Sequence, residues 1–346
     1  MADFLGNKND NSLTGTADAD TIGGFGGNDI LKGLGGIDFI LGGSGKDLIE
    51  GGAGPDFMDG QDGTDTLSYS SSPAGVTIVL GNAEGTVTTA SGGDAAGDSA
   101  LHFENITGSA FSDRLTGNDF ANVLKGGAGV DTLIGRAGKD TLKGGADNDL
   151  LIGGAGADIV DGGAGFDQLA YIDSTAGVRV ILGKNGAETI GKGGEAQGDR
   201  ISKVEDVYGS NYADRLTGNN LANGLSGNDG DDRLNGGGGN DTLNGGEDND
   251  RLVGGKGNDE LNGSIGNDAF VFGRGFGHDT IGDFAEGAGL GDVIRFDKDV
   301  FKNFSAVDAA SVQVGADVVI TKNADNTITI RNVTLADLNA DDFSFF

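Results

Sequence analysis

Aspartates recur every nine residues through most of this sequence, and an apolar residue follows each of them two places later. In GGSGKDLIE, residues 42–50, the sixth residue is Asp47 and the eighth is Ile49, and GGAGPDFMD at 51–59 repeats this pattern. A fixed period of this kind marks an internal repeat. A flexible Gly/Asp linker is the alternative, but a disordered chain has no reason to hold carboxylates and aliphatic residues in register.

The repeats form three blocks with the same pattern inside each unit, with aspartates at 20–65, 113–167 and 214–268. The second and third blocks both have asparagine in their second unit, at Asn122 and Asn223. The segments between blocks also match, because LSYSSSPAGVTIVLG at 67–81 corresponds to LAYIDSTAGVRVILG at 169–183. A larger module of about a hundred residues is therefore duplicated.

Glycine contributes 69 of the 346 residues without a collagen-like triplet, so it serves tight or left-handed turns. The last three residues of each unit are expected to form a short strand, and two units make a coil of about 18 residues. Stacked coils would point eighth-place residues inward and ninth-place residues such as Lys32, Glu50 and Lys143 outward. The pattern predicts an all-β fold, a parallel β-roll (β-solenoid) with β-rich spacers and a C-terminal β cap.

This arrangement places Asp38 over Asp56 and Asp29 over Asp47 on the two edges of the stack. Two unit charges about 4.8 Å apart repel by roughly 3 to 4 kcal/mol at an effective dielectric constant near 20. Each coil buries only two apolar residues, which cannot offset repeated repulsion and the ordering of the chain. A counter-ion between the turns is therefore expected.

Calcium suits these turns, because carboxylate and carbonyl oxygens are its preferred ligands and magnesium demands stricter octahedral geometry. Zinc is disfavoured, since the chain has no cysteine and its two histidines, His102 and His278, lie far apart outside the repeats. We expect both histidines to be surface or locally packed residues. No segment has the spacing of an EF-hand loop.

The units GGSGKDLIE, GGAGPDFMD, GGAGADIVD and GGKGNDELN resemble the RTX, or haemolysin-type, calcium-binding nonapeptide GGxGxDxUx. The resemblance covers nearly the whole chain. It implies that multiple Ca²⁺ ions sit between same-side turns, held by sixth-place aspartates and by carbonyls of the glycine-rich loop. The candidate metal ligands are Asp20, Asp29, Asp38, Asp47, Asp56, Asp65, Asp113, Asp131, Asp140, Asp149, Asp158, Asp167, Asp214, Asp232, Asp241, Asp250, Asp259 and Asp268.

Several units depart from the pattern. Asn122 and Asn223 replace the sixth-place aspartate, and Asp147 and Asp248 replace the fourth-place glycine, which puts calcium occupancy beside these units in doubt. The early unit at 6–14 has Asn11 in the aspartate place and is expected to cap the stack.

The sequence divides into six segments. They are a first block at 1–68, a spacer at 69–107, a second block at 108–170, a spacer at 171–208, a third block at 209–272, and a C-terminal cap with a secretion signal at 273–346. Tyr69 and Tyr171 belong to spacers whose alternating apolar residues favour structural inserts over a sugar-binding face. In the last segment, VQVGADVVIT and NTITIRNVTL are expected to form strands.

The formal net charge of -31 opposes binding to nucleic acid or anionic membranes, and no stretch is apolar enough to span a bilayer. The N-terminus does not resemble a cleavable secretory signal. FVF, GHDTIGDF and the tail DDFSFF resemble the cap and uncleaved signal that end many RTX proteins. The resemblance implies export of the unfolded chain from a Gram-negative cell by a type I exporter, followed by folding in extracellular calcium.

Three functions remain open at this point. The first is a secreted, non-enzymatic calcium-binding protein at or near the cell surface, in matrix building, adhesion or host interaction, with surface polysaccharide as a possible partner. The second is an extracellular polysaccharide-active enzyme that uses the roll as a folding aid, although no HExxH or GxSxG motif is present. The third is a surface-layer protein that self-assembles with calcium.

Overall fold

The computed structural model describes residues 2–82, 88–285 and 291–346. The chain forms two compact units, Met1–Gln168 and Leu169–Phe346. Parts of the first spacer (83–87) and of the C-terminal segment (286–290) lie outside the described residues. The six segments proposed above remain a prediction about domain organisation.

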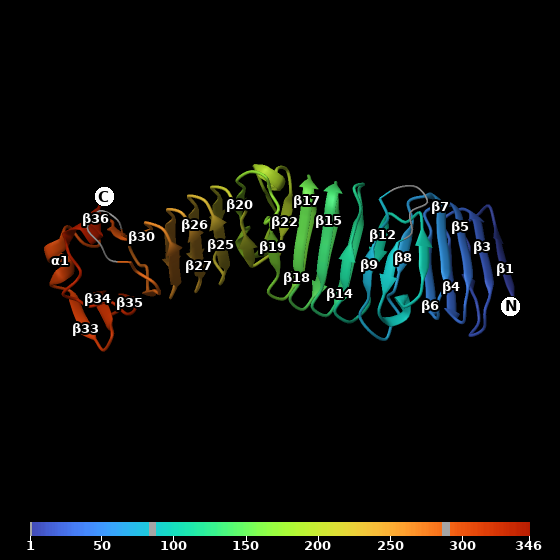
Figure 1. Ribbon diagram of the computed structural model, residues 1–346, viewed down its shortest axis with the longest axis horizontal. Helices are drawn as coiled ribbons and strands as arrows, with labels where there is room; N and C mark the ends of the chain where they lie inside the picture. Colours follow the sequence, from blue (N-terminus) through green and yellow to red (C-terminus); the bar gives the residue numbers. More distant parts are fainter. Residues whose placement is uncertain (1, 83–87, 286–290) are drawn as a thin grey trace. The chain divides into compact units, whose positions relative to one another are not determined.

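The first unit is a stack of parallel strands, drawn from blue to green in Figure 1. Its ladders run in the orders β1-β3-β5-β7-β11, β2-β4-β6-β8-β12-β14-β16-β18 and β9-β13-β15-β17. Its strands are β1 (Asp3–Asn7), β2 (Ser12–Thr14), β3 (Thr21–Gly26), β4 (Ile30–Gly35), β5 (Phe39–Gly45), β6 (Leu48–Ala53), β7 (Phe57–Gly63), β8 (Thr66–Ser68), β9 (Thr77–Val79), β10 (Thr89–Ser91), β11 (Ser99–Leu101), β12 (Asn105–Thr107), β13 (Arg114–Thr116), β14 (Val123–Ala128), β15 (Thr132–Gly138), β16 (Thr141–Ala146), β17 (Leu150–Gly156) and β18 (Ile159–Ala164), with β19 (Gln168–Ala170) at the division between the units and the 3₁₀ turn η1 at Gly93–Ala95.

The second unit continues the same construction in two ladders, β20-β24-β26-β28-β30-β32-β36 and β23-β25-β27-β29-β31-β35-β34-β33. Its strands are β20 (Arg179–Ile181), β21 (Thr189–Ile190), β22 (Arg200–Ser202), β23 (Asp206–Tyr208), β24 (Arg215–Thr217), β25 (Gly224–Asp229), β26 (Arg233–Gly238), β27 (Thr242–Glu247), β28 (Arg251–Lys256), β29 (Glu260–Ile265), β30 (Ala269–Phe272), β31 (His278–Ile281), β32 (Val293–Phe296), β33 (Ser311–Val314), β34 (Asp317–Asn323), β35 (Asn326–Ile330) and β36 (Phe343–Phe345). The helical pieces are α1 (Phe304–Asp308), η2 (Lys184–Gly186), η3 (Gly194–Ala196) and η4 (Ala340–Asp342).

The predicted parallel β-solenoid is confirmed, and each coil within a block contains 18 residues. Ile30 of β4 pairs with Leu48 of β6, and Thr21 of β3 pairs with Phe39 of β5. The strands are longer than the three residues expected from the sequence. They begin at the seventh place of one unit and continue into the third place of the next, because parallel ladder pairing persists through the glycines.

Eighth-place residues form the core, as the repeat predicts. Ile22, Leu31 and Ile40 in the first unit, and Leu234 and Leu243 in the second, have no solvent exposure. Each stacks on the equivalent residue of the next coil, so a continuous apolar column runs through each block.

The expectation that ninth-place residues face solvent is wrong for Glu50, which is 5% exposed. The start of the first spacer covers it, and one Glu50 oxygen accepts a hydrogen bond from the backbone N–H of Ser71 at 2.9 Å. Lys32 on the neighbouring coil forms an ion pair with the other oxygen at 3.0 Å. A tertiary contact, and not the repeat pattern, therefore decides this position.

The spacers build strands into the stack. In the first spacer, β9 pairs in parallel with β13, while β12 pairs with both β8 and β14. Val76, Ile78 and Leu80 are buried, in accord with a structural role for these apolar residues.

The C-terminal segment forms the expected β cap. The hairpin of β34 and β35 joins the ladder through β31, and β36 pairs in parallel with β32. Phe296 lies at the centre of an aromatic cluster with Phe272, Phe301, Phe343 and Phe345. Phe343 and Phe345 of the tail DDFSFF therefore pack against the end of the roll.

Candidate metal sites at the turns

Sixth-place aspartates stack along each edge of the roll and are linked by hydrogen bonds. The backbone N–H of Asp38 donates to Oδ1 of Asp56 at 2.8 Å, and the N–H of Asp29 donates to Oδ1 of Asp47 at 2.8 Å. The predicted stacking of these residues is therefore present. The bond uses one carboxylate oxygen to hold neighbouring coils in register, and it leaves the other oxygen for a different partner.

Within the described residues, that other oxygen is buried and receives no hydrogen bond in most units. A buried charged oxygen without a donor or cation is strongly unfavourable, so these atoms require a partner. Oδ2 is in this state in Asp29, Asp38, Asp47, Asp56, Asp65, Asp131, Asp140, Asp149, Asp232, Asp241, Asp250, Asp259 and Asp279.

Asp158, Asp167 and Asp268 occupy the same place and are at most 1% exposed. They accept the corresponding backbone hydrogen bonds from Asp140, Asp149 and Asp250. Their turns therefore have the same geometry as the others.

First-place glycines bring carbonyl oxygens toward these carboxylates. A Cβ on Gly24 would lie 2.2 Å from Oδ2 of Asp29 and 2.4 Å from the carbonyl oxygen of Gly42 on the next coil of the same edge. Gly33 has the same surroundings, with Oδ2 of Asp38 at 2.2 Å. Only glycine fits here, and a carboxylate and a carbonyl from adjacent turns consequently face one small space.

This donor set suits Ca²⁺, which takes carboxylate and backbone carbonyl oxygens in flexible geometry. Among the described residues, no three acidic, histidine or cysteine side chains converge on one point. A site here would therefore combine one or two aspartates with backbone carbonyls of two turns. When bound, the ion would supply the positive charge that the stacked carboxylates lack.

Burial strongly favours the protonated form of these carboxyl groups. It raises the pKa of Asp56 and of Asp65 to about 7, and neighbouring carboxylates add to the effect. In the second unit the pKa of Asp232 rises to about 8 for the same reasons. Without a cation, protons compete for these oxygens near neutral pH.

These pKa values predict how folding depends on pH in calcium-free buffer. The folded-state pKa values, about 6 to 8, lie above the unfolded value of 3.8, so the folded state binds more protons. Their contribution to stability is complete below pH 3.8 and is lost as the pH rises through 6 to 8. We therefore expect more strand signal in circular dichroism at pH 5 than at pH 8.

The same competition predicts that calcium binds more weakly at acid pH. Because protons already stabilise the folded roll at pH 6, the calcium concentration needed for half-maximal folding should decrease as the pH falls from 8 to 6, although each folded site then binds calcium more weakly. A midpoint independent of pH over this range would contradict carboxylate ligation.

Three candidate ligands have a different environment, because each begins a block and finds donors within its own turn. The Oδ2 atom of Asp113 accepts from the N–H of Ser109 at 2.5 Å, and its Oδ1 accepts from the Ser109 hydroxyl at 2.9 Å. Asp214 has the same two bonds to Ser210. Asp20 accepts from both the N–H and the hydroxyl of Thr16. Their geometry gives weaker support for ligation than that of later units.

Asn122 and Asn223 fill the aspartate place with an amide. The side-chain nitrogen of Asn122 donates to the carbonyl oxygen of Glu104 at 2.7 Å, and that of Asn223 donates to Glu205 at 2.8 Å. At these two units the amide nitrogen therefore makes a hydrogen bond to a backbone carbonyl of the neighbouring turn. The fourth-place Asp147 and Asp248 keep the left-handed turn, with φ of 74° each, so the backbone there is preserved.

Residues outside the repeats extend the rows of carboxylates. Asp56 N–H donates to Oδ1 of Asp98 in the first spacer, and Asp65 N–H donates to Oε2 of Glu104. At the C-terminal end, Asp259 N–H donates to Asp279 and Asp268 N–H donates to Asp292. The nine-residue spacing does not predict these pairs, since the donor and acceptor residues are 42, 39, 20 and 24 residues apart in the sequence.

In the spacers, a tyrosine hydroxyl donates a hydrogen bond to the Oδ2 atom, the carboxylate oxygen that has no partner in the repeats. The hydroxyl of Tyr69 donates to Oδ2 of Asp98 at 2.9 Å, and that of Tyr171 donates to Oδ2 of Asp199 at 2.9 Å. All four residues are buried. Tyr69 and Tyr171 therefore satisfy carboxylates where each block meets its spacer.

The two histidines make local contacts. Nδ1 of His102 lies 2.7 Å from Oδ1 of Asp59, and Nδ1 of His278 lies 2.9 Å from the hydroxyl oxygen of Thr327. This agrees with the expectation that both are locally packed.

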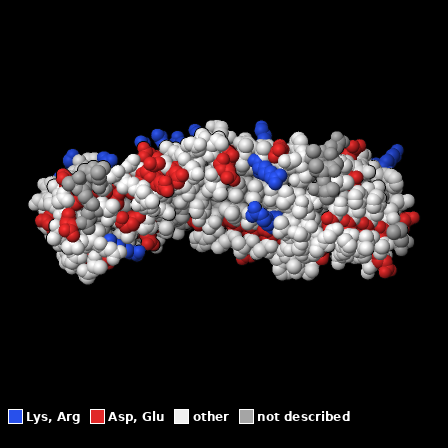
Figure 2. All heavy atoms as spheres, viewed as in Figure 1, with Lys and Arg blue, Asp and Glu red and all other residues white. Residues whose placement is uncertain are grey.

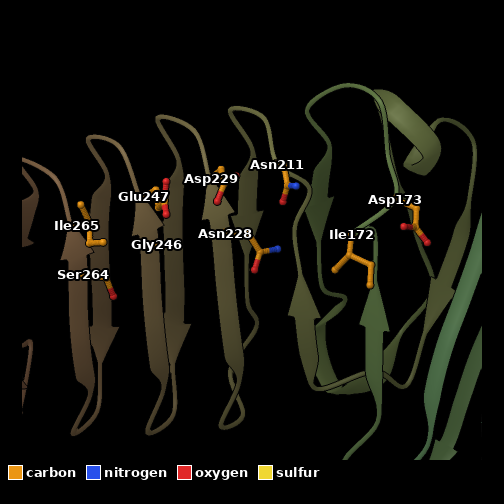
Figure 3. A pocket seen from close by; sticks show the side chains of 9 residues that line it. All are labelled: Ile172, Asp173, Asn211, Asn228, Asp229, Gly246, Glu247, Ser264 and Ile265. Atoms are coloured by element: carbon orange, nitrogen blue, oxygen red, sulfur yellow. The ribbon is translucent and has the colours of Figure 1, made fainter.

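The second unit also has an open hollow of about 470 Å³, shown in Figure 3. Asp229 and Glu247 lie in register on neighbouring coils and present two carboxylates to it, and Ile265 continues the row. A ligand with several hydroxyl groups or positive charge would suit this lining.

Acidic residues outnumber basic ones by 54 to 23 in the sequence. Figure 2 shows a row of them across β1 to β7 and a cluster around β25 and β26. Among the described residues, no helix has the length and apolar character needed to cross a membrane. The surface charge favours cationic partners.

Comparison with known proteins adds a family match. A family model described as RTX calcium-binding nonapeptide repeat (4 copies) matches more than half of the chain. The matched residues are 5–40, 41–71, 107–142, 134–169, 208–243, 218–252 and 244–281.

No curated protein matches the sequence. Among solved structures, the extracellular lipase LipA from Serratia marcescens is similar at 19% sequence identity with a TM-score of 0.23. The match covers 67% of this chain and 39% of the lipase chain, so this chain spans about two fifths of that protein.

Proposed function

Because this chain belongs to the RTX calcium-binding repeat family, we propose that it is a secreted, non-enzymatic protein that folds on binding extracellular calcium and acts at or near the cell surface. The buried, unpartnered carboxylate oxygens at successive turns carry this proposal. They make the folded roll depend on a cation that the surroundings must supply.

The difference between extracellular and cytosolic calcium would determine where the chain folds. Extracellular calcium modules bind at about 10⁻⁴ to 10⁻³ M, far above cytosolic calcium. A chain that obtains its folding free energy from such sites stays unfolded inside the cell and folds outside. This suits passage through a type I exporter, which is typical of the family.

A polysaccharide-active enzyme is the second candidate, and the hollow with Asp229 and Glu247 is the observation that favours it. Paired carboxylates are the usual catalytic groups of glycoside hydrolases. As a non-enzymatic site, the same hollow would bind surface or matrix glycans without cleaving them.

Incubation of the calcium-loaded protein with polysaccharide and peptide pools tests these functions. We expect saturable binding to glycans or cells, without new reducing ends or peptide products. Product formation that Asp229→Asn or Glu247→Gln abolishes would establish the enzyme instead. Light scattering that grows with protein concentration only in calcium would instead favour a self-assembling surface layer.

A further inference from the structure

One outward face of the second unit carries a column of basic side chains. Arg215 of β24 pairs in register with Arg233 of β26, and Arg233 pairs with Arg251 of β28. Arg179 of β20 pairs with Arg215, and Lys192 pairs with Arg179 in an antiparallel bridge. Residues paired in this way point to the same face of a sheet, on strands about 4.8 Å apart. These five residues form the basic column.

The column faces solvent. The residue that follows each arginine is buried in the core, so the arginines point outward. Arg179, Arg215 and Arg233 are exposed, and Arg251 is half-buried. Figure 2 shows a row of basic side chains along the rim of the second unit, near β20 and β26 of Figure 1.

No carboxylate neutralises the basic column within the described residues, although the sequence has 54 acidic residues and 23 basic ones. Other basic residues of the unit do form ion pairs, since Arg200 lies 2.9 Å from Glu188 and Arg331 lies 3.1 Å from Glu260. Like charges directly opposite each other on neighbouring strands destabilise a sheet. The described contacts of the chain therefore leave this repulsion uncompensated.

Arg251 shows the effect of the crowded charges. Burial, together with the positive charges of Arg295 and Arg233, lowers the pKa of the Arg251 guanidinium group. The group still carries its charge at neutral pH, because arginine is not deprotonated in proteins. An anion on the column would relieve the repulsion.

Uncharged side chains lie beside the basic column. Side chains alternate along a strand, so the residue two places after each arginine lies on the same face. These residues are Ile181, Thr217, Asn235 and Val253, and each is at least partly exposed. The face therefore joins a strip of guanidinium groups to a strip of apolar and amide groups. A chain of sugar rings that carries carboxylates suits both strips, because guanidinium groups bind carboxylates in a bidentate geometry.

Nucleic acid suits this face less well. Proteins that bind single strands stack the bases on aromatic side chains, and none of the residues of β20, β24, β26 and β28 is aromatic. A duplex carries a charge about every 1.7 Å, and the net charge of -31 opposes so dense a polyanion. A uronate polysaccharide carries a single carboxylate on each sugar and meets less of this opposition.

We propose that the basic column binds an acidic polysaccharide, a chain of uronate sugars that lies along the stack with its carboxylates on the guanidinium groups. This inference rests on the proposed function and names the class of surface or matrix polymer that the protein would hold. The column belongs to the ladder of β20, β24, β26 and β28, whereas Asp229 and Glu247 of the hollow belong to the ladder of β25 and β27.

Calorimetric titration of the calcium-loaded protein with oligogalacturonate, in lengths too short to gel with calcium, tests the proposal. We expect saturable binding that weakens as salt is added, and no binding of the methyl ester, which has the same sugars without the charge. The double variant Arg215→Gln, Arg233→Gln should bind roughly tenfold more weakly. The matched control is Arg200→Gln, Arg331→Gln, which removes two arginines that already have partners and should keep the wild-type affinity.

Equal binding of acid and ester by the wild type would overturn the proposal without reference to a variant. So would an unchanged affinity in the double variant of the column. Tighter binding of single-stranded DNA of the same charge would assign the column to nucleic acid instead. Light scattering that decreases in the double variant, without glycan binding by the wild type, would assign it to contacts with a second copy of the chain.

Circular dichroism in calcium separates this inference from the proposed function. We expect the wild type and both double variants to show the same strand signal. A wild-type protein that folds in calcium but does not bind oligogalacturonate would reject this inference alone. Failure of the wild type to fold in calcium would reject the proposed function and, with it, the column.

Discussion

Removing calcium at pH 8 is expected to unfold the repeat blocks of both units. The buried Oδ2 atoms of residues such as Asp47 and Asp140 then have neither a donor nor a cation, and stacked charges repel. Calcium at tenfold above its dissociation constant contributes about 1.4 kcal/mol per site. Successive sites add along the stack, and nearest-neighbour contacts should make the transition cooperative.

Circular dichroism across a calcium titration measures this effect. We expect a disordered spectrum in EGTA and full strand signal at about 10⁻⁴ to 10⁻³ M calcium. Magnesium at the same concentration is the control and should leave the chain unfolded. A chain that is compact and ordered in EGTA at pH 8 would contradict the account of the turns given above.

Replacing Asp38 with asparagine should weaken calcium binding in the first block. Asparagine keeps an oxygen to accept the hydrogen bond from Asp20 N–H, but it removes the charge and the free carboxylate oxygen. We expect the calcium midpoint for folding of this block to increase on the order of tenfold, because affinity follows the number of charged ligands. Hydrogen exchange of β4 to β7 during a calcium titration would localise the loss.

In calcium-free buffer at pH 8, the same variant should have the opposite effect. Burial raises the pKa of Asp38, so its charge disfavours the folded state there, and asparagine removes that charge. Protection of the same strands should therefore be equal to or greater than in the wild type.

Asp20→Asn is the matched control. Both Asp20 oxygens accept hydrogen bonds, from Ala2 and Thr16, and these bonds lower the pKa of Asp20. We expect this substitution to raise the calcium midpoint much less than Asp38→Asn does, and only through the stability that is lost without calcium. Equal calcium shifts in the two variants would show that unpartnered oxygens do not mark the ions.

The register of the roll follows from the sequence because the eighth-place apolar residues and the sixth-place aspartates both recur with a fixed period. Eighth-place residues such as Leu31 and Leu133 must be buried together, which sets the 18-residue coil. Sixth-place residues such as Asp29 then fall on one edge without further assumptions. Strand length was underestimated, because the glycines suggested turns where the backbone still pairs with the next coil.

The hydrogen-bond partners and the burial of each carboxylate could not be predicted from the repeat spacing. Asp20 and Asp38 occupy the same place in their units, yet a threonine four residues earlier satisfies only the first. Asp98 of the first spacer accepts a hydrogen bond from Asp56, 42 residues earlier in the sequence, and the nine-residue repeat does not extend into that spacer. Glu50 is buried because the chain of the spacer folds back over it.

The sequence by itself determined the solenoid, its coil length, the residues that face the core and the chemical class of the ion. These properties depend on spacing, and a periodic chain repeats its local geometry wherever the pattern holds. Only the tertiary structure decided which oxygens remain without a donor and which spacer residues, such as Asp98, join the rows of carboxylates, because those depend on contacts between distant segments that no local period encodes.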